Sequence, residues 1–404
     1  MNKIILLISI EGTYLGGAQK RYLSLFNYIC DKRKDYYLVI NKKLYYSLLE
    51  NNFLKSYENV RVLTLYGEKK LSTNGKSDNT LYEKSKEDFP KKSSGFRIFL
   101  GRKMMFLKSI LRWVTFVFEF RKIIKELKSK IVYAIWTGGM YAWPLRNVFK
   151  FRMIYSYNDA SVQITSKSIE DIFNYSEYWA LKKAHRIDFL SPEIVEVYES
   201  KFGKLAKDKI TVTPNSFIDY EKYFSDRDKE NSVLFLSRLW PSKNPILYLQ
   251  SVKLFNESHP DLSGIKFYII GDGGLVENIK EFILINNLKN VYFEDGTPEP
   301  WKYLRKSKVF ISIQQFNNYP SQSLIEAMAC ENAIIASDVG ETRLLVTEDE
   351  GILVDLNPQS IADAVFKLFS TKGLIEKLGS NARKKVIKEH TVEKFADYFY
   401  SITN

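Results

Sequence analysis

The 404-residue sequence has few of the residues that build disulfide frameworks or metal centres. It holds only two cysteines, Cys30 and Cys330, and three histidines that are scattered along the chain. Two thiols in so long a chain argue against a disulfide scaffold and for a reducing compartment. The scattered histidines give no sign of a metal site. The absence of a Gly-x-Ser-x-Gly pattern or a Cys/His arrangement argues against a covalent nucleophile.

Long hydrophobic runs are also missing. No segment reaches the ~18 uncharged apolar residues that a transmembrane helix needs. The apolar start, Ile4–Ile10, has no sizeable basic region before it and no small-residue cleavage site after it, and it runs into Gly12. We therefore expect a first buried strand rather than a signal peptide, and a cytoplasmic protein.

The length and composition indicate a globular protein of two domains. A chain of 404 residues is too long for one ordinary core. Its 45% hydrophobic and 26% charged residues are typical of a folded rather than a disordered chain.

Short β-rich runs alternate with helical patterns along the whole chain. Helices are expected, for example, over Ala18–Cys30, Ile169–Lys183 and Pro245–Phe255. The expected strands are Ile4–Ile10, Tyr37–Ile40, Val60–Leu65, Ile131–Trp136, Phe151–Tyr155, Arg186–Leu190, Ile210–Val212, Val233–Leu236, Lys266–Ile270, Val291–Phe293, Val309–Ile313, Ala333–Ala336 and Ile352–Val354. Such alternation predicts an α/β fold with two doubly wound, Rossmann-like domains facing each other across a cleft.

The domain boundaries follow from composition. Residues 1–222 form the expected N-terminal domain, and residues 233–388 form the C-terminal domain. The charged stretch 223–232 lacks apolar spacing, which is typical of a linker. Residues 389–404 are expected to form a helix that crosses back to the N-terminal domain. The polar segment 66–95 has no periodicity and is expected to be a mobile loop.

Much of the net charge of +13 lies between Arg97 and Lys130, where ten basic residues stand against two acidic ones. A helix is expected over 97–128, with one polar stripe on an otherwise apolar surface. The stripe consists of Lys108, Arg112, Thr115, Glu119, Lys122 and Glu126. The helix is either a core helix with a solvated edge or an interfacial helix that binds anionic lipid through Lys108, Arg112 and Trp113. Nucleic acid is not an expected partner, because no recognition motif accompanies the charge.

Two strand-to-helix crossings carry the side chains best suited to bind a ligand. The first, Ser237–Lys243, carries Arg238 and Lys243, and the second, Asn317–Cys330, carries Glu326. In a parallel α/β domain such crossings open at the carboxyl edge of the sheet, where ligands bind. Arg and Lys suit a diphosphate and a carboxylate suits sugar hydroxyls, so we expect a nucleotide diphosphate. Solvated surface charge is the alternative for the cations, and a helix-start carboxylate favoured by the dipole is the alternative for Glu326.

Three glycine-containing loops are further candidates. Gly16 and Gly17 follow the first strand and allow backbone amides to approach an anion, although a purely structural turn is an alternative. Ile270–Gly274 resembles a dinucleotide loop but lacks the full Gly-x-Gly-x-x-Gly spacing, which favours a tight turn. Val339–Arg343 offers free amides and a carboxylate.

Together these motifs resemble the family-4 retaining glycosyltransferases of the GT-B fold, of the bacterial surface-polysaccharide type. The resemblance is densest from Thr211 to Val354. The matching stretches are the Gly-Gly loop at 16–17, Thr213-Pro-Asn-Ser216, Leu236-Ser-Arg-Leu followed by Lys-Asn-Pro245, Ile270-Gly-Asp-Gly273, Tyr319-Pro-Ser followed by Glu-Ala-Met-Ala329, and Asp338-Val-Gly-Glu-Thr342.

The resemblance implies roles for individual residues. Arg238 and Lys243 hold the donor diphosphate, and Glu326 binds the donor ribose. Gly16 and Gly17 lie near the donor phosphate and the acceptor. The remaining donor-binding residues are expected to be Asn317, Asn318, Tyr319, Gly340, Glu341 and Thr342.

The sequence departs from the family pattern at two places. The family has a second Glu about eight residues before Glu326, where this chain has Asn317 and Asn318. Asn can hydrogen-bond sugar hydroxyls but carries no charge. The family's first-domain His is not evident, and Asn158 and Asp159 occupy the comparable place on the acceptor side.

The implied reaction is transfer of a sugar from a nucleotide diphosphate donor with retained configuration, without a metal ion or other cofactor. The basic helix points to a glycan or polyprenyl-linked acceptor at the inner face of the plasma membrane, in cell-surface polysaccharide synthesis. Two alternatives remain open from the sequence. One is a nucleotide-sugar epimerase of the same architecture, and the other is a catalytically silent GT-B binding protein.

Overall fold

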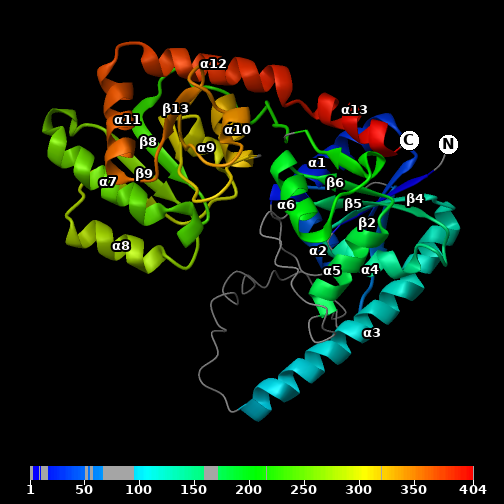
Figure 1. Ribbon diagram of the computed structural model, residues 1–404. Coiled ribbons are helices and arrows are strands. Elements are labelled where there is room, and N and C mark those ends of the chain that lie inside the picture. The colour runs from blue at the N-terminus through cyan, green and yellow to red at the C-terminus, as the bar shows by residue number, and fades with distance from the viewer. Residues whose placement is uncertain are drawn as a thin grey trace. The chain divides into compact units, whose positions relative to one another are not determined.

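The computed structural model describes residues 3–8, 10, 17–50, 53–54, 58–66, 95–158, 172–214, 216–319 and 321–403 (Figure 1). Contacts divide the chain into two compact units. The first comprises Met1–Phe189, Lys204–Thr211 and Thr403, and the second comprises Leu190–Gly203, Val212–Ile402 and Asn404.

The first unit is built around a sheet with the strand order β3-β2-β1-β4-β5-β6-β7. Every residue of β1 and β4 is buried, as expected for strands covered on both faces. The strands are β1 (Ile4–Leu7), β2 (Tyr36–Asn41), β3 (Val60–Leu63), β4 (Ile131–Ile135), β5 (Arg152–Tyr157), β6 (Arg186–Phe189) and β7 (Ile210–Val212). The helices are α1 (Gly17–Lys32), α2 (Lys42–Glu50), α3 (Gly95–Leu127), α4 (Thr137–Ala142) and α5 (Ile172–Lys183).

The second unit contains a six-stranded parallel sheet with the order β10-β9-β8-β11-β12-β13. Its strands are β8 (Glu230–Leu236), β9 (Lys266–Ile270), β10 (Val291–Glu294), β11 (Ser307–Ser312), β12 (Ala333–Ser337) and β13 (Gly351–Val354). Its helices are α6 (Pro192–Phe202), α7 (Pro245–Ser258), α8 (Val276–Ile285), α9 (Trp301–Leu304), α10 (Gln322–Ala329), α11 (Pro358–Ser370), α12 (Leu374–Glu389) and α13 (Val392–Thr403).

Alternating residues of the central strands supply the two cores of the second unit. Val233 and Phe235 of β8 pack with side chains of α7, α8 and α11. Leu234, on the opposite face, packs with side chains of α10 and α12. The sheet is therefore covered by helices on both faces, and its carboxyl edge is left for ligands.

Each sheet has a point where its strand order reverses. In the second unit, β8 lies between β9 and β11, and in the first, β1 lies between β2 and β4. The loops that leave adjacent strands at such a point diverge, which opens a crevice at the carboxyl edge. The residues after β8 and β11 are the two strand-to-helix crossings that the sequence singles out.

The predicted α/β class and the positions of the strands are confirmed. The expected linker, 223–232, differs from the structure. Tyr223 lies in the core of the second unit, Arg305 pairs with Asp226 at 2.6 Å, and β8 already begins at Glu230. These contacts attach the segment to the second unit, which includes Leu190–Gly203 and resumes at Val212.

The last helix, α13, groups with the second unit except for its final residue. Thr403 groups with the first unit, where its hydroxyl oxygen lies 3.0 Å from that of Tyr36. The predicted crossing of this helix to the N-terminal domain stays a prediction. The predicted mobile loop at 66–95 lies outside the described residues from 67 to 94.

Helix α3 begins and ends close to the predicted bounds, but its surfaces differ from the prediction. Two residues of the predicted polar stripe contact β3 and the segment after it. Thr115 accepts a hydrogen bond from the Tyr66 N–H at 3.0 Å, and Glu126 pairs with Arg61 at 2.6 Å. Trp113 is partly buried and donates its indole N–H to the Tyr141 carbonyl at 3.2 Å. The prediction that Trp113 faces a membrane stays a prediction, although its indole N–H is already used inside the protein.

A different face of α3 is exposed. Leu107, Ile110, Val114 and Phe118 recur at steps of three and four residues and are 57%, 37%, 37% and 61% exposed. Arg121 and Lys125 continue the same face and are exposed. Phe116, Phe120, Ile123 and Leu127 on the opposite face are buried. Within the described part of the chain, no helix combines the length and apolarity needed to cross a membrane.

Candidate ligand site of the second unit

The loop after β8 carries Arg238 and Lys243 to the carboxyl edge of the sheet. A single turn, Pro241–Lys243, is followed by Asn244 in the left-handed region with φ of 56°, and Pro245 begins α7. The Asn244 side chain donates to the Ile313 carbonyl at 2.9 Å, and the Gln315 N–H donates to the Ser242 carbonyl at 2.9 Å. The β8–α7 loop is thereby fixed to the end of β11.

The loop after β9 supports the same region from the other side. The Leu239 N–H donates to the Asp272 carbonyl at 2.8 Å, and the Ser237 N–H donates to the Ile270 carbonyl at 3.1 Å. A Cβ at Gly271 would lie 1.8 Å from the Ser237 carbonyl oxygen, and one at Gly273 would lie 2.5 Å from that of Leu239. Glycine is therefore required where this loop touches the Arg238 loop, which agrees with the predicted tight turn.

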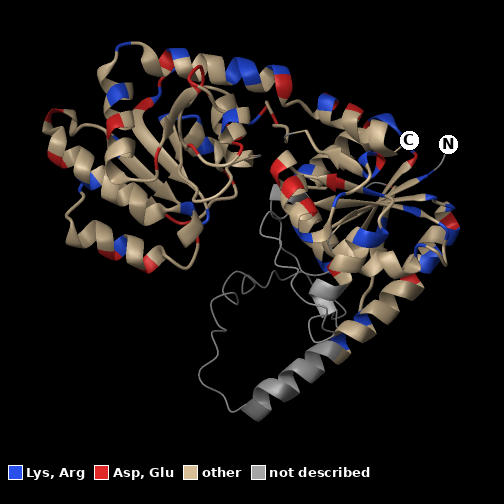
Figure 2. Ribbon diagram, viewed as in Figure 1, with Lys and Arg blue, Asp and Glu red and all other residues tan. Residues whose placement is uncertain are grey.

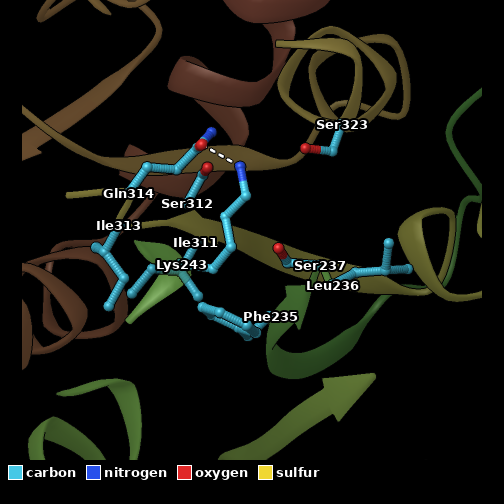
Figure 3. A pocket seen from close by; sticks show the side chains of 9 residues that line it. All are labelled: Phe235, Leu236, Ser237, Lys243, Ile311, Ser312, Ile313, Gln314 and Ser323. Atoms are coloured by element: carbon cyan, nitrogen blue, oxygen red, sulfur yellow. Dashed lines mark hydrogen bonds between the residues drawn. The ribbon is translucent and has the colours of Figure 1, made fainter. Parts of the chain in front are cut away.

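A pocket lies between the ends of β8 and β11 (Figure 3). Ser237 and Lys243 line it from the β8 side, Ser312 and Gln314 from the β11 side, and Ser323 from α10. Lys243 points across the pocket and donates a hydrogen bond from its Nζ to Gln314 Oε1. Apolar residues of β8 and β11 complete the lining, so the pocket combines one cation, several hydroxyl and amide groups and an apolar floor, a combination that can bind an anionic ligand.

Lys243 carries its charge in an unfavourable setting. Burial and the positive charge of Arg238 lower the pKa of Lys243 to about 8. Among the described residues, no carboxylate lies within ion-pair distance of its Nζ. An anionic ligand would supply the missing negative charge.

Arg238 and Glu326 belong to the same edge but not to the lining of this pocket. Arg238 is exposed on the loop that precedes Lys243. Glu326 is partly buried in the second turn of α10, where its Oε1 accepts from the Gln322 side chain at 3.0 Å. Burial, followed by the charge of Glu326 and a hydrogen bond to it, raises the pKa of the Tyr223 hydroxyl. Glu326 therefore has partners within the protein, and ribose binding stays a prediction.

The two asparagines that replace the family's acidic residue have different environments. Asn318 is 1% exposed, and its amide donates to the Ser312 carbonyl at 3.0 Å. Its Oδ1 accepts from Gln314 Nε2. Because its polar atoms are used inside the protein, the expectation that Asn318 contacts the donor is not supported by its position.

Asn317 lies beside two carboxylates. Its amide donates to Glu193 of α6, which groups with the second unit, and to Glu341 at 3.4 Å. Its Oδ1 accepts from the Tyr319 N–H at 2.8 Å and the Glu341 N–H at 3.2 Å. Gly340 has φ of 51°, and a Cβ there would lie 2.9 Å from Asn317 Cγ. The structure therefore places Glu193 and Glu341 close to the position where the family's acid is missing.

Three further predicted residues, Thr342, Gly17 and Asn158, lie within the described part of the chain. Thr342 is buried and donates to the Val339 carbonyl at 2.6 Å, which is a structural contact. Gly17 begins α1, and Asn158 Oδ1 accepts from the Ser156 hydroxyl at 3.4 Å. Gly16 and Asp159 lie outside the described residues. Sequence reasoning missed Gln314 and Glu193, although Gln314 stands one residue after the predicted strand Val309–Ile313, where pocket residues are expected.

Metal ligands do not gather anywhere in the described ranges. Among these residues there is no group of three or more His, Cys, Asp or Glu side chains arranged to hold a metal ion. The prediction that no metal or other cofactor is needed stays a prediction.

The second unit, which carries this site, is the part of the chain that matches a known protein family. Residues 219–385 match the model of the family described as Glycosyl transferases group 1. The second unit of this chain is thus similar to the group 1 glycosyl transferases over most of its length. The resemblance predicted from the motifs is therefore confirmed.

Two curated relatives extend the similarity beyond this group 1 unit. The poly(ribitol-phosphate) alpha-N-acetylglucosaminyltransferase of Staphylococcus aureus (strain COL) is 24% identical over 302 residues, covering 71% of this chain and 58% of the relative. The UDP-Gal:alpha-D-GlcNAc-diphosphoundecaprenol alpha-1,3-galactosyltransferase of Escherichia coli is 26% identical over 256 residues, covering 57% of this chain and 63% of the relative. The match thus spans about three fifths of each relative's length.

A solved structure shares the fold over the whole chain. HepE from Anabaena, in a crystal structure with UDP and glucose, superimposes with a TM-score of 0.72 at 14% sequence identity, covering 100% of this chain and 99% of HepE. The predicted fold class, GT-B with two Rossmann-like domains, is confirmed by this similarity and by the two parallel sheets.

Proposed function

We propose that this chain is a retaining glycosyltransferase that uses a nucleotide diphosphate sugar. Its acceptor is a glycan or lipid-linked glycan in cell-surface polysaccharide synthesis. The observation that carries the proposal is Lys243, a half-buried cation that lines a pocket at the reversal point of the unit that matches the group 1 glycosyl transferases. The relatives named above, which act on poly(ribitol-phosphate) and on a diphosphoundecaprenol-linked sugar, support the acceptor class.

The proposed chemistry follows from the cations. The acceptor hydroxyl attacks the anomeric carbon on the face that the diphosphate leaves. The bond from that carbon to the diphosphate oxygen breaks, and the departing phosphate oxygen takes the hydroxyl proton. Arg238 and Lys243 stabilise the charge that grows on the diphosphate, as preorganised cations do most effectively in a site shielded from water. On this proposal the two side chains do the work that a divalent metal does in other enzymes.

The function is tested by supplying the purified chain with UDP-, GDP- and ADP-sugars and a lipid-linked glycan acceptor. We expect one donor to raise the thermal unfolding temperature and to yield a product with the donor's anomeric configuration. Chelation of divalent ions is expected to leave the rate unchanged. Stabilisation by no nucleotide sugar and no transfer above background would contradict the proposal.

Donor binding is expected to depend on pH through Lys243. The folded pKa of about 8 lies below the ordinary lysine value, so the ammonium is present below pH 8 and lost as pH rises through it. We expect the affinity for UDP to be level below about pH 7 and to fall roughly tenfold per pH unit above the lysine pKa, measured by calorimetry. The variant Lys243→Arg stays charged and should lose this dependence. A flat profile for the wild-type chain up to about pH 9.5 would exclude Lys243 as the titrating ligand.

We also propose that the exposed face of α3 binds an anionic membrane surface on the cytoplasmic side. The apolar residues Leu107, Ile110, Val114 and Phe118 can enter the interface, and Arg121 and Lys125 on the same face can contact lipid phosphates. Lys108 is exposed at the flank of this face. Figure 2 shows basic residues at several positions along the described part of α3. This surface would bring a lipid-linked acceptor to the enzyme.

Flotation with vesicles measures this binding. The wild-type chain is expected to float with phosphatidylglycerol-containing vesicles and not with pure phosphatidylcholine vesicles. The double variant Arg121→Glu/Lys125→Glu should bind at least tenfold more weakly, because each basic residue near an anionic surface contributes ~1 kcal/mol. Lys253→Glu, which alters an exposed lysine on α7, is the control. Equal flotation of the double variant and the wild type would exclude this face.

A further inference from the structure

Lys243 is held by a chain of neutral amides. Its ammonium donates to Gln314 Oε1, and Gln314 Nε2 donates to Asn318 Oδ1. Asn318 Nδ2 then donates to the Ser312 carbonyl at 3.0 Å and lies 3.1 Å from the Ser312 hydroxyl. The chain of contacts starts at a pocket-lining cation and ends at backbone inside the sheet.

The two ends fix the direction of every hydrogen bond. An ammonium only donates and a backbone carbonyl only accepts, so each amide must accept on the Lys243 side and donate on the Ser312 side. A side-chain amide satisfies both requirements at positions 314 and 318. A carboxylate at either position could not donate the hydrogen bond toward Ser312, and it would add negative charge close to Lys243. Asparagine at 318 is therefore the residue type that completes the chain without neutralising the lysine.

This series of hydrogen bonds is also anchored against movement. Asn318 is 1% exposed, and Ser312 is 8% exposed at the end of β11. The Gln314 carbonyl accepts a hydrogen bond from the buried Ser337 hydroxyl at 2.8 Å, which ties it to β12. Lys243, Gln314 and Ser312 line the pocket, whereas Asn318 lies behind them and does not.

We propose that Asn318 and Gln314 are positioning residues that aim the Lys243 ammonium at the donor diphosphate while leaving its charge available. This inference rests on the proposed donor site and deepens it. It assigns to Asn318 an indirect role in place of the sugar contact that the resemblance implies. The neutral residue at this position is then a working part of the site and not a sign of lost activity.

The proposal predicts a specific pattern of coupling in UDP binding, measured by calorimetry on the full chain. Asn318→Leu and Gln314→Met keep the side-chain size and remove the hydrogen bonds. Each is expected to weaken UDP binding about tenfold, as for loss of a hydrogen bond to a charged group, and the double variant should be no weaker than either single variant. Gln315→Ala, at the exposed neighbouring position, is the matched control and should bind as the wild type does.

The Lys243→Met background separates positioning from general damage. There we expect Asn318→Leu to have no further effect, because the residue acts only through Lys243. Equal weakening in both backgrounds, or wild-type affinity of Asn318→Leu and Gln314→Met, would overturn the inference. Should Asn318→Leu not fold, Gln314→Met, at a partly exposed position, gives the same test.

The outcomes also distinguish this inference from the donor-site proposal. If Lys243→Met binds UDP as the wild type does, the donor site itself is wrong and the positioning role fails with it. If Lys243→Met loses binding while the amide variants do not, only the positioning role fails. As a further check, Gln314→Glu should move the pH at which UDP affinity falls to a higher value, because a carboxylate beside Lys243 favours its charged form.

Discussion

Replacing Lys243 by alanine is expected to lower the rate of sugar transfer by about 100-fold or more. The ammonium faces the pocket with no carboxylate partner among the described residues, so its charge is available to the leaving diphosphate. Removal of one preorganised stabilising group from a shielded site raises the barrier by ~3 kcal/mol. The initial rate of product formation at saturating donor and acceptor measures the effect. Arg238→Ala should act in the same direction.

The control for this prediction is Lys253→Ala. Lys253 is an exposed lysine of α7 whose Nζ lies 3.9 Å from Glu257, so its removal changes the net charge equally without touching the pocket. Transfer by Lys253→Ala should equal that of the wild type. Full activity of the Lys243→Ala variant with its true donor would refute the assignment of this lysine to the leaving group.

Replacing Gly271 by alanine is expected to destabilise the second unit by about 3 kcal/mol. The new methyl group would lie 1.8 Å from the Ser237 carbonyl oxygen and 3.2 Å from Leu239 Cγ, which leaves it no room. The β8 loop must then shift, so donor affinity should fall as well. The midpoint of urea unfolding and the affinity for UDP measure the two effects.

Gly264→Ala is the matched control, because a Cβ at Gly264 meets no atom within 4 Å. Its unfolding midpoint should be close to that of the wild type. An unchanged midpoint for Gly271→Ala would mean that the β9–α8 turn relaxes without cost, and the proposed support of the Arg238 loop by this glycine would be wrong.

The strands of both sheets were predictable because parallel strands are buried on both faces and read as short apolar runs. Val309–Ile313 and Lys266–Ile270, for example, match β11 and β9 within two residues. The linker was misplaced because residues 223–232 look charged and aperiodic, yet Tyr223 is a core residue and Asp226 pairs with Arg305. Tertiary contacts of this kind leave no periodic signal in the sequence.

The candidate site was likewise predictable only in part. Arg238 and Lys243 are candidates from the sequence because charged residues after a strand lie at the carboxyl edge, and of the two the structure places Lys243 in the lining of the pocket. The roles of Gln314 and Glu193 depend on contacts between segments that are far apart in the chain, so spacing alone could not reveal them. For α3, periodicity located a polar stripe, but only the position of β3 decides that this stripe faces Arg61 and Tyr66 while Leu107 and Phe118 face outward.

The two cysteines, one in each unit, have a practical consequence. Cys30 and Cys330 are both free and buried, and burial raises the pKa of each thiol to about 12. A thiol that is neither accessible nor ionised does not react with alkylating or disulfide reagents while its surroundings stay closed. Each cysteine therefore becomes reactive only when its own unit opens. The natural chain thus carries a separate chemical reporter of local opening for each of its two units, without any engineered label.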